Sequence, residues 1–196
     1  MARPREFDEA AVLDAALHCF WSRGFEATSV RDLIACTGIA GASLYNAFGD
    51  KRALYRRALD RYVDRSVAQR IRRSADLPPL VAIGAFFADI LARSLADPDR
   101  KGCLLVNAAL EVAPHDPDFQ RVVAAVLIEI ETFFRRCVTA GQEDGSITRA
   151  QPAADLARHL LGVLMGVRVL ARVRPERALL EGVVNPALAL LVPPGE

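Results

Sequence analysis

The residues of this chain best suited to specific recognition lie between positions 41 and 46. In a helix that begins here, Leu44 and Phe48 are four residues apart and share one face, which we expect to be buried. The opposite face carries small and hydrogen-bonding side chains that can approach a groove closely, and Asn46 can pair with adenine through two hydrogen bonds. The pattern indicates a surface that reads bases in double-stranded DNA.

A second short helix must lie before this one to position it. Ser29 can cap its first turn, and Asp32 three residues later completes a capping-box arrangement. Thr37 and Gly38 then interrupt the apolar periodicity, and Gly38 can adopt the positive φ that a helix end needs before an abrupt change of direction. Two short helices around a tight turn predict a helix-turn-helix.

Residues 24–52 as a whole resemble the DNA-binding half of the tetracycline-repressor (TetR/AcrR) family of transcriptional regulators. The resemblance rests on short motifs in register: Gly24-Phe25, Thr28-Ser29-Val30-Arg31-Asp32, Gly38-Ile39, Ser43-Leu44-Tyr45 and Phe48-Gly49-Asp50-Lys51. Several matches in register arise by chance far less often than one short motif does.

The resemblance also implies which residues meet DNA. Ala42 and Asn46 would lie nearest the bases, whereas hydroxyl groups and cationic side chains would hold phosphates. The full set is Arg3, Arg5, Ser29, Gly41, Ala42, Ser43, Tyr45, Asn46 and Lys51. The chain departs from the family at Ala40, where many members have a serine, so the contact of that hydroxyl is in doubt.

The composition is that of a helical globular protein. Of the 196 residues, 52% are hydrophobic and 25% are charged, which excludes a disordered chain. Apolar residues recur at intervals of three and four, so we expect an all-α fold. Residues 1–75 hold 13 Lys/Arg against 9 Asp/Glu, and residues 76–196 hold 12 against 15. A basic N-terminal part joined to a mildly acidic remainder is typical of a polyanion-binding segment joined to a segment with a different function.

Caps, glycines and prolines divide the chain into about nine helices. We expect a helix-turn-helix DNA-binding domain over residues 1–52 and an effector-binding and dimerisation domain over residues 53–196. The arginines from Arg61 onward are interpreted as the solvated face of a connecting helix. Outside the helix-turn-helix pair, the predicted helices are 8–23, 50–73, 80–96, 102–113, 117–140, 152–173 and 176–191.

The last two predicted helices are apolar over most of their circumference. One chain of this size cannot cover both, so they indicate a subunit interface, and Gly162 and Gly166 would let helices approach closely there. The interface residues that we expect are Leu160, Leu161, Leu164, Val183 and Leu188. A two-fold homodimer would place two reading helices roughly 34 Å apart on a palindromic operator.

The helices between these parts leave room for a small-molecule effector, whose pocket should be mostly apolar. The effector-contacting residues that we expect are Phe86, Phe87, Ile90, Cys103, Asn107, Phe119, Val123 and Leu127. The sequence therefore predicts a transcriptional repressor that a small hydrophobic effector releases from its operator. The family resemblance implies that the effector tilts the fourth helix and moves the reading heads out of register.

Two other classes of protein compete with this interpretation. An enzyme would need a nucleophile elbow, a phosphate-cradling glycine loop or a metal-binding histidine pair, and the sequence shows none of these. We therefore expect no enzymatic activity, no cofactor and no metal. An architectural helical protein would keep its DNA affinity when the small molecule is added. Neither a signal-peptide core nor a membrane span is visible, so we expect a cytoplasmic protein.

The kind of signal stays open because of the cysteines. Cys19, Cys36, Cys103 and Cys137 are widely spaced and are read as free thiols. Cys103 follows Lys101 at a predicted helix start, where nearby positive charge and the helix N-terminus lower the pKa of a thiol. An electrophile- or oxidant-sensing repressor acting through Cys103 is therefore the alternative. Cys103 would be the most reactive thiol, with Cys19 and Cys36 packed inside the DNA-binding domain.

Overall fold

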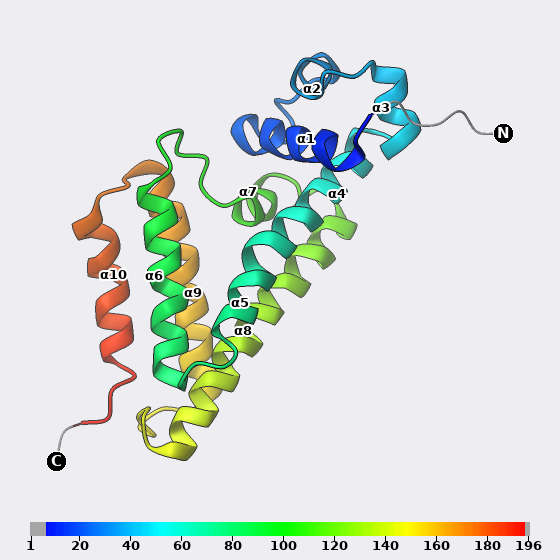
Figure 1. Cartoon of the computed structure of the whole chain (residues 1–196). Coiled ribbons are helices and arrows are strands. Elements are labelled where there is room, and N and C mark those ends of the chain that lie inside the picture. Colours follow the sequence, from blue (N-terminus) through cyan, green and yellow to red (C-terminus); the bar gives the residue numbers. More distant parts are fainter. Residues whose placement is uncertain (1–6, 195–196) are drawn as a thin grey trace.

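The computed structural model describes residues 7–194, and every regular element in that range is helical (Figure 1). Its nine helices, with α4, η1 and α5 counted as one, confirm the all-α class. The elements are α1 (Glu9–Arg23), α2 (Val30–Thr37), α3 (Gly41–Phe48), α4 (Lys51–Val63), η1 (Asp64–Ala68), α5 (Gln69–Ser74), α6 (Pro79–Leu95), α7 (Leu104–Glu111), α8 (Pro117–Asp144), α9 (Ala153–Val173) and α10 (Arg177–Ala189).

Helices α1, α2 and α3 form a compact head at one end of the molecule (Figure 1). The predicted capping box is present at α2, because Ser29 Oγ accepts from the Asp32 amide and the Asp32 carboxylate accepts from the Ser29 amide. Gly38 ends α2 with φ 72°, a left-handed conformation that favours glycine. The helix-turn-helix therefore forms as the local sequence predicts.

A long helix carries the head. Asp50 caps its start by accepting from the Ala53 amide at 2.7 Å. Helices α4 and α5 are continuous through the π-helical segment η1, so the prediction of one helix from 50 to about 73 is confirmed. The π-helical insertion was not predicted, and such insertions are frequent at functional sites.

The arginines of this helix are not simply a solvated face. Arg61 and Arg65 both pair with Asp14 of α1, and Arg61 holds the pKa of that carboxyl at about 2. Arg70 is only 5% exposed and its Nε donates to Asp89 of α6 at 2.7 Å. The prediction that the arginines from Arg61 onward form a solvated face is therefore wrong for Arg61 and Arg70. Sequence periodicity alone did not show that α1 and α6 bring carboxylates to this side of the helix.

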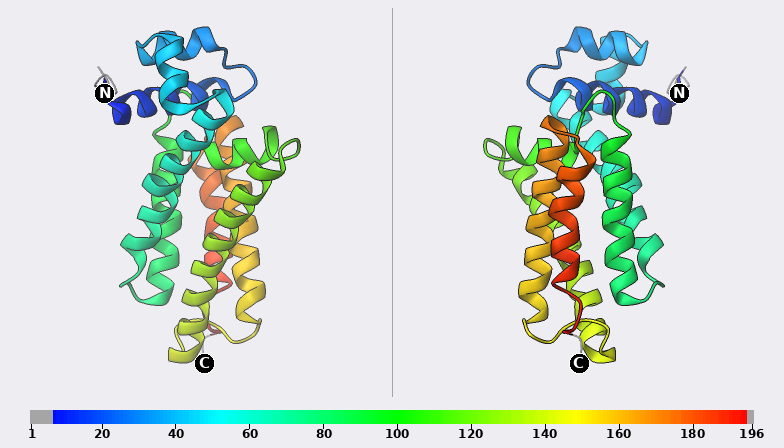
Figure 2. Two further views of the ribbon diagram at one scale, coloured as in Figure 1. Left: turned by 90° about the vertical axis from the view of Figure 1, so that its right-hand side faces the viewer. Right: turned by 90° about the vertical axis from the view of Figure 1, so that its left-hand side faces the viewer.

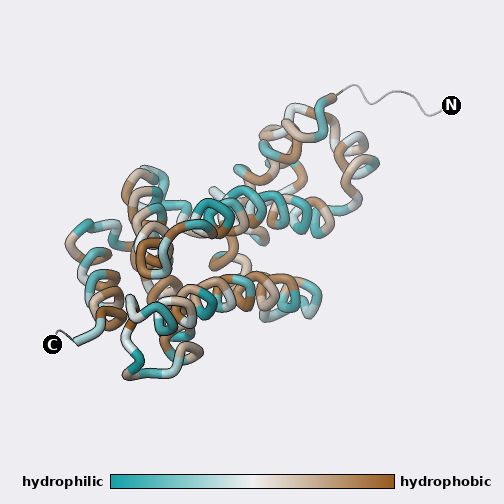
Figure 3. The backbone as a smooth tube through the Cα atoms, turned by 60° about the horizontal axis from the view of Figure 1, so that its bottom comes forward, coloured by the Kyte–Doolittle hydropathy of each residue, from teal (hydrophilic) through white to brown (hydrophobic). Residues whose placement is uncertain are grey.

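Helices α6, α8, α9 and α10 stand beside the long helix and form the larger core. Figure 2 shows them running roughly along it, with the head at one end of the molecule. Four phenylalanines of α6 and α8 pack ring against ring: Phe86, Phe87, Phe133 and Phe134. Along most helices the tube in Figure 3 changes between hydrophobic and hydrophilic within a turn, as amphipathic helices require. No helix of residues 7–194 is both long and apolar enough to cross a membrane.

Helix α8 continues a turn beyond its predicted end near Ala140 and stops at Asp144. Both Gly141 and Gly145 were expected to mark the exit, and the end at Ala140 was wrong because Gly141 serves a close contact within the helix. A Cβ placed there would lie 2.6 Å from the buried Ile147 side chain, so Gly141 lets the following loop pack onto α8. Gly145, with φ 81°, ends the helix instead.

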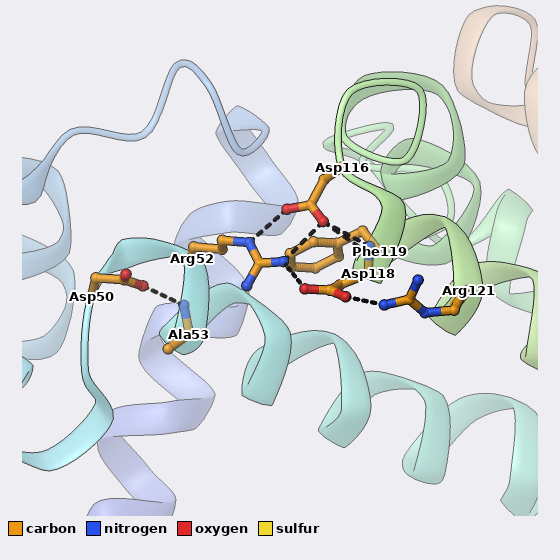
Figure 4. Close-up of polar contacts among 7 residues, drawn as sticks. All are labelled: Asp50, Arg52, Ala53, Asp116, Asp118, Phe119 and Arg121. Atoms are coloured by element: carbon orange, nitrogen blue, oxygen red, sulfur yellow. Dashed lines mark hydrogen bonds and ion pairs between the residues drawn. The ribbon is translucent and has the colours of Figure 1, made fainter.

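An arginine clamp fixes the start of the long helix to the start of α8 (Figure 4). The Arg52 guanidinium donates to both oxygens of Asp116 and to Asp118, and it lies 5.5 Å from the centroid of the Phe119 ring. The hydrogen bonds from Arg52 hold the pKa of Asp116 well below its ordinary value. Arg52 is therefore engaged within the chain, so a phosphate role would require it to leave this clamp.

Candidate DNA-binding surface and effector cavity

Helix α3 presents the face that its sequence predicts. Leu44 and Phe48 are buried, whereas Ala42, Ser43 and Asn46 are exposed on the other side. No side chain within residues 7–194 caps the start of α3, because its N-cap is Ala40. The face thus combines small side chains, hydrogen-bonding groups and the N-terminal amides of a helix, all of which suit contact with nucleic acid.

The other residues predicted to contact DNA differ in their exposure and in the contacts that they already make within the chain. Tyr45 is half-buried, and Ser29 is exposed but holds its capping box. Gly41 packs against α2, since a Cβ there would lie 3.1 Å from Ile34 Cδ1. Lys51 Nζ lies 4.5 Å from the centroid of the Phe25 ring and donates to the Glu26 carbonyl at 3.4 Å. Arg3 and Arg5 lie outside the described residues.

A cavity of about 330 Å³ lies where the head meets the larger core. Its walls come from α1, the long helix, α6, the loop that follows α6, and α9. The lining residues are Trp21, Tyr62, Ser66, Arg70, Arg93, Ser94, Ala96, Asp97, Pro98, Lys101, Gly102, Arg168 and Ala171. The π-helical segment contributes Ser66, so the irregular turn of the long helix borders the cavity directly.

Aromatic contacts tie the cavity wall to the head. Trp21 of α1 packs edge-on against Tyr62 at 5.0 Å between ring centroids, and its Nε1 donates to the Gly102 carbonyl at 3.2 Å. The Tyr62 hydroxyl in turn lies 3.4 Å from Cys103 Sγ. A molecule bound in this cavity would therefore touch a helix of the DNA-binding head and the helix that carries it.

None of the eight residues predicted to contact an effector lines this cavity. Phe86, Phe87 and Ile90 are fully buried in the core, and Phe119 packs between Tyr55 and the Arg52 clamp. The remaining four are Cys103, Asn107 and Val123, which are buried, and Leu127, which is half-buried.

Sequence reasoning missed the polar residues of the cavity wall. One signal was available, because Arg168 follows the uncharged run from Leu160 to Val167 in α9, and a charge beside such a run needs an explanation. Asn107 lies close to the cavity without lining it: its Nδ2 donates to the Lys101 carbonyl at 3.1 Å, and its Oδ1 accepts from Arg172 at 2.8 Å. These bonds position the loop that forms one wall.

The residues predicted for a subunit interface fall into two groups. Leu160 and Leu164 are buried within the single chain, so they belong to its own core and are not available to a partner. Leu161, Val183 and Leu188 are half-buried and remain accessible. The prediction for Leu160 and Leu164 fails because their face of α9 turns toward the neighbouring helices. A different line of residues faces outward: Gly162, Gly166, Val169 and Val173.

The structure also revises the environment of the thiols. Cys103 is 7% exposed and caps α7 beside Tyr62, which does not favour the sensing alternative. Cys36 was expected inside the head, yet it is exposed, because the short helix α2 buries only Leu33. Burial raises the pKa of Cys19 to about 12, and the neighbouring Cys36 thiol acts in the same direction.

We expect brief alkylation of the native protein to label Cys36 first. Cys19 and Cys103 are buried, and burial also raises the pKa of Cys137, which leaves fewer thiolates there. Mass spectrometry after a short iodoacetamide pulse measures the order, and Cys36→Ser should remove the fastest-labelled peptide. Faster labelling of Cys103 would contradict the burial that the structure shows.

Comparison with known proteins agrees with the fold and with the helix-turn-helix. Residues 12–58 match the model of bacterial regulatory proteins of the tetR family, and residues 79–185 match the tetracyclin repressor-like C-terminal domain. The chain belongs to the tetR family of bacterial transcriptional regulators. Members of this family are DNA-binding regulators.

Named relatives extend over nearly the whole chain. The HTH-type transcriptional regulator YezE of Bacillus subtilis is 31% identical over 97% of this chain and 100% of its own length. The HTH-type transcriptional repressor ComR of Escherichia coli is 30% identical over 87% of this chain and 82% of its own length.

A solved structure with DNA is also similar. A cysteine-substituted form of the TetR family regulator CifR, complexed with a 26-bp double-strand operator DNA, superposes with a TM-score of 0.85. It is 31% identical and covers 97% of this chain and 100% of that chain.

Proposed function

We propose that this protein is a homodimeric repressor that binds a palindromic operator and releases it when a small molecule occupies the cavity. The observation that carries the DNA-binding part is the exposed face of α3, which Leu44 and Phe48 anchor in the core of the head. CifR, with its operator DNA, and the repressor ComR support the same role by similarity. Residues 1–52 would form the DNA-binding domain and residues 53–196 the effector-binding and dimerisation domain.

The position of the cavity suggests how release would occur. Trp21 lies in the head, Tyr62 and Ser66 lie in the long helix, and all three contact the same cavity. The Arg52 clamp holds the other end of that helix against α8, so a displacement at the cavity would turn the head about a fixed point. A ligand drives such a change only if it binds the released state more tightly, typically by ~1–3 kcal/mol.

We expect Lys51→Ala to weaken binding to all DNA sequences alike and to reduce the slope of log affinity against log salt by about one unit. The reason is that a lysine paired with a phosphate releases one counterion and reads no base. Fluorescence anisotropy with a palindromic duplex from beside the gene, measured at several salt concentrations, gives the slope.

Asn46→Ala is the matched contrast, since the residue lies on the exposed face of α3 and carries no charge. It should leave the salt slope unchanged and relax the preference at one base position in each half-site, by about 1–3 kcal/mol. A sequence-selective loss for Lys51→Ala with an unchanged slope would refute the phosphate assignment.

A further inference from the structure

The cavity between the head and the larger core is rich in positive charge. Four cationic side chains line it, namely Arg70, Arg93, Lys101 and Arg168, and Asp97 is the one acidic residue among the lining residues. A volume of about 330 Å³ is at the small end of the range of roughly 300–1,000 Å³ for ligand sites. The space therefore suits one small molecule, and its walls favour a negative charge.

Some of these cations are neutralised by neighbours within the protein. Asp89 accepts hydrogen bonds from both Arg70 and Arg93, so one carboxylate serves two guanidinium groups. Lys101 Nζ lies 2.8 Å from Asp99 and 3.7 Å from Asp97. The carboxylates thus account for Lys101 and for only part of the arginine charge.

The fourth cationic lining residue, Arg168, differs from the other three in its partners. It is 8% exposed, and among residues 7–194 it forms no ion pair; Nη1 donates only to Ser94 Oγ, at 3.3 Å. Arg70 is 5% exposed, and its buried Nη2 has no hydrogen-bond partner in the described part of the chain. Burial and the nearby Arg168 charge both lower the pKa of Arg70, against the effect of Asp89. A buried charge without a counter-charge is destabilising, which applies to Arg168, and Arg70 shares its one counter-charge, Asp89, with Arg93. Folding alone therefore does not account for two arginines at this place.

The rest of the wall is suited to an apolar body. The Trp21 indole lies beside Tyr62, and the Lys101 ammonium lies 5.7 Å from the centroid of its ring. Ala171 and Pro98 add apolar surface, while Ser66 offers a hydroxyl. A molecule with a charged end at the arginines would place its other end against these side chains.

We propose that the effector of this protein is a small organic anion, held by Arg168 and Arg70 at its acidic group and by Trp21 at a planar apolar body. The proposal rests on the function proposed above, because it names the ligand class of the same cavity. A carboxylate or a phosphate group can accept two parallel hydrogen bonds from the forked donors of arginine. Since Trp21 belongs to α1, the bound ring reaches the DNA-binding head directly.

The single tryptophan of the chain gives a direct readout, because its side chain lines the cavity. We expect benzoate to change the Trp21 fluorescence saturably, with at least tenfold tighter binding than benzamide, which has the same shape without the charge. Phenyl phosphate and inorganic phosphate are titrated in parallel. Tighter binding of phenyl phosphate than of benzoate assigns a phosphate monoester, and the reverse assigns a carboxylate. No saturable response to any anion, or binding of benzamide as tight as that of the tighter of the two aromatic anions, overturns the proposal.

Arg168→Met tests the residue itself. The variant keeps an unbranched apolar stem and removes an unpaired buried charge, so it should unfold at the same temperature as the wild type or higher. We expect its benzoate affinity to fall at least tenfold, to the level of benzamide. Arg158→Met is the matched control on the same helix, since Arg158 is exposed and pairs with Asp155 and Glu131. Unchanged benzoate affinity in Arg168→Met would overturn the assignment, and the wild-type comparison stands even if the variant fails to fold.

Operator binding separates this proposal from the one on which it rests. If the wild-type protein binds a palindromic duplex but binds neither benzoate nor phenyl phosphate more tightly than benzamide, the anion proposal fails alone. If it binds either anion more tightly than benzamide but binds no DNA more tightly than a random duplex, the repressor function fails while the anion site stands. Release of the duplex by benzoate in the wild type, but not in Arg168→Met, supports both.

Discussion

We expect the Ala42→Asp variant to fold and assemble normally but to lose operator affinity by roughly a hundredfold or more. Ala42 is exposed in the first turn of α3, where a carboxylate is compatible with the helix dipole, so the fold should tolerate the change. On the DNA, the same carboxylate would face phosphates and base edges, and like-charge contact costs several kcal/mol at an interface. Fluorescence anisotropy with the operator duplex measures the loss, and circular dichroism checks the fold.

Ala140→Asp is the matched control, because it adds the same charge at an exposed position near the end of α8. It should change operator affinity by less than about threefold, since that end of the molecule lies away from the head. Nearly wild-type operator affinity in Ala42→Asp would show that another surface binds the DNA.

The second large effect is expected at the residues of α9 that face outward. Val169 is 46% exposed in the single chain and lies on one face with Gly162, Gly166 and Val173. A Cβ at either glycine would meet nothing within 4 Å, so the face is smooth and open to a second copy. In a two-fold dimer, Val169→Asp would bring a carboxylate from each protomer into one apolar seam. We expect sedimentation velocity to show monomers, with operator affinity reduced roughly a hundredfold or more through loss of the second half-site.

Ile128→Asp gives the control for this experiment. Ile128 is an exposed aliphatic side chain of α8, 61% accessible, so the variant introduces the same charge outside the proposed seam. It should remain dimeric and bind the operator as the wild type does. An intact dimer in Val169→Asp would refute the placement, and dissociation in Ile128→Asp would move the interface to α8.

The sequence by itself determined the local structure of the head. Capping at Ser29, the positive φ of Gly38 and the four-residue spacing of Leu44 and Phe48 are each set by a few neighbouring residues. These three local features are therefore predictable without knowing how the rest of the chain packs. The family followed from the same stretch, because its motifs are contiguous.

Prolines and glycines mark most helix limits in the sequence, but two features of the helices were not predicted. Helix α8 passes through Gly141 because Ile147 occupies the space where a side chain would lie. The π-helical segment of the long helix is likewise absent from any local pattern.

The cavity and the outward face of α9 were decided only by the tertiary structure. Periodicity shows that α9 is apolar, but it does not show which side its neighbours cover, so Leu160 and Val169 could not be told apart. An arginine in a sequence is most often solvated, and only the packing of five segments makes Arg70 and Arg168 buried neighbours at one cavity. Their significance comes from burial and from a counter-charge that is shared for Arg70 and missing for Arg168, which are properties of the surroundings and not of the residue type.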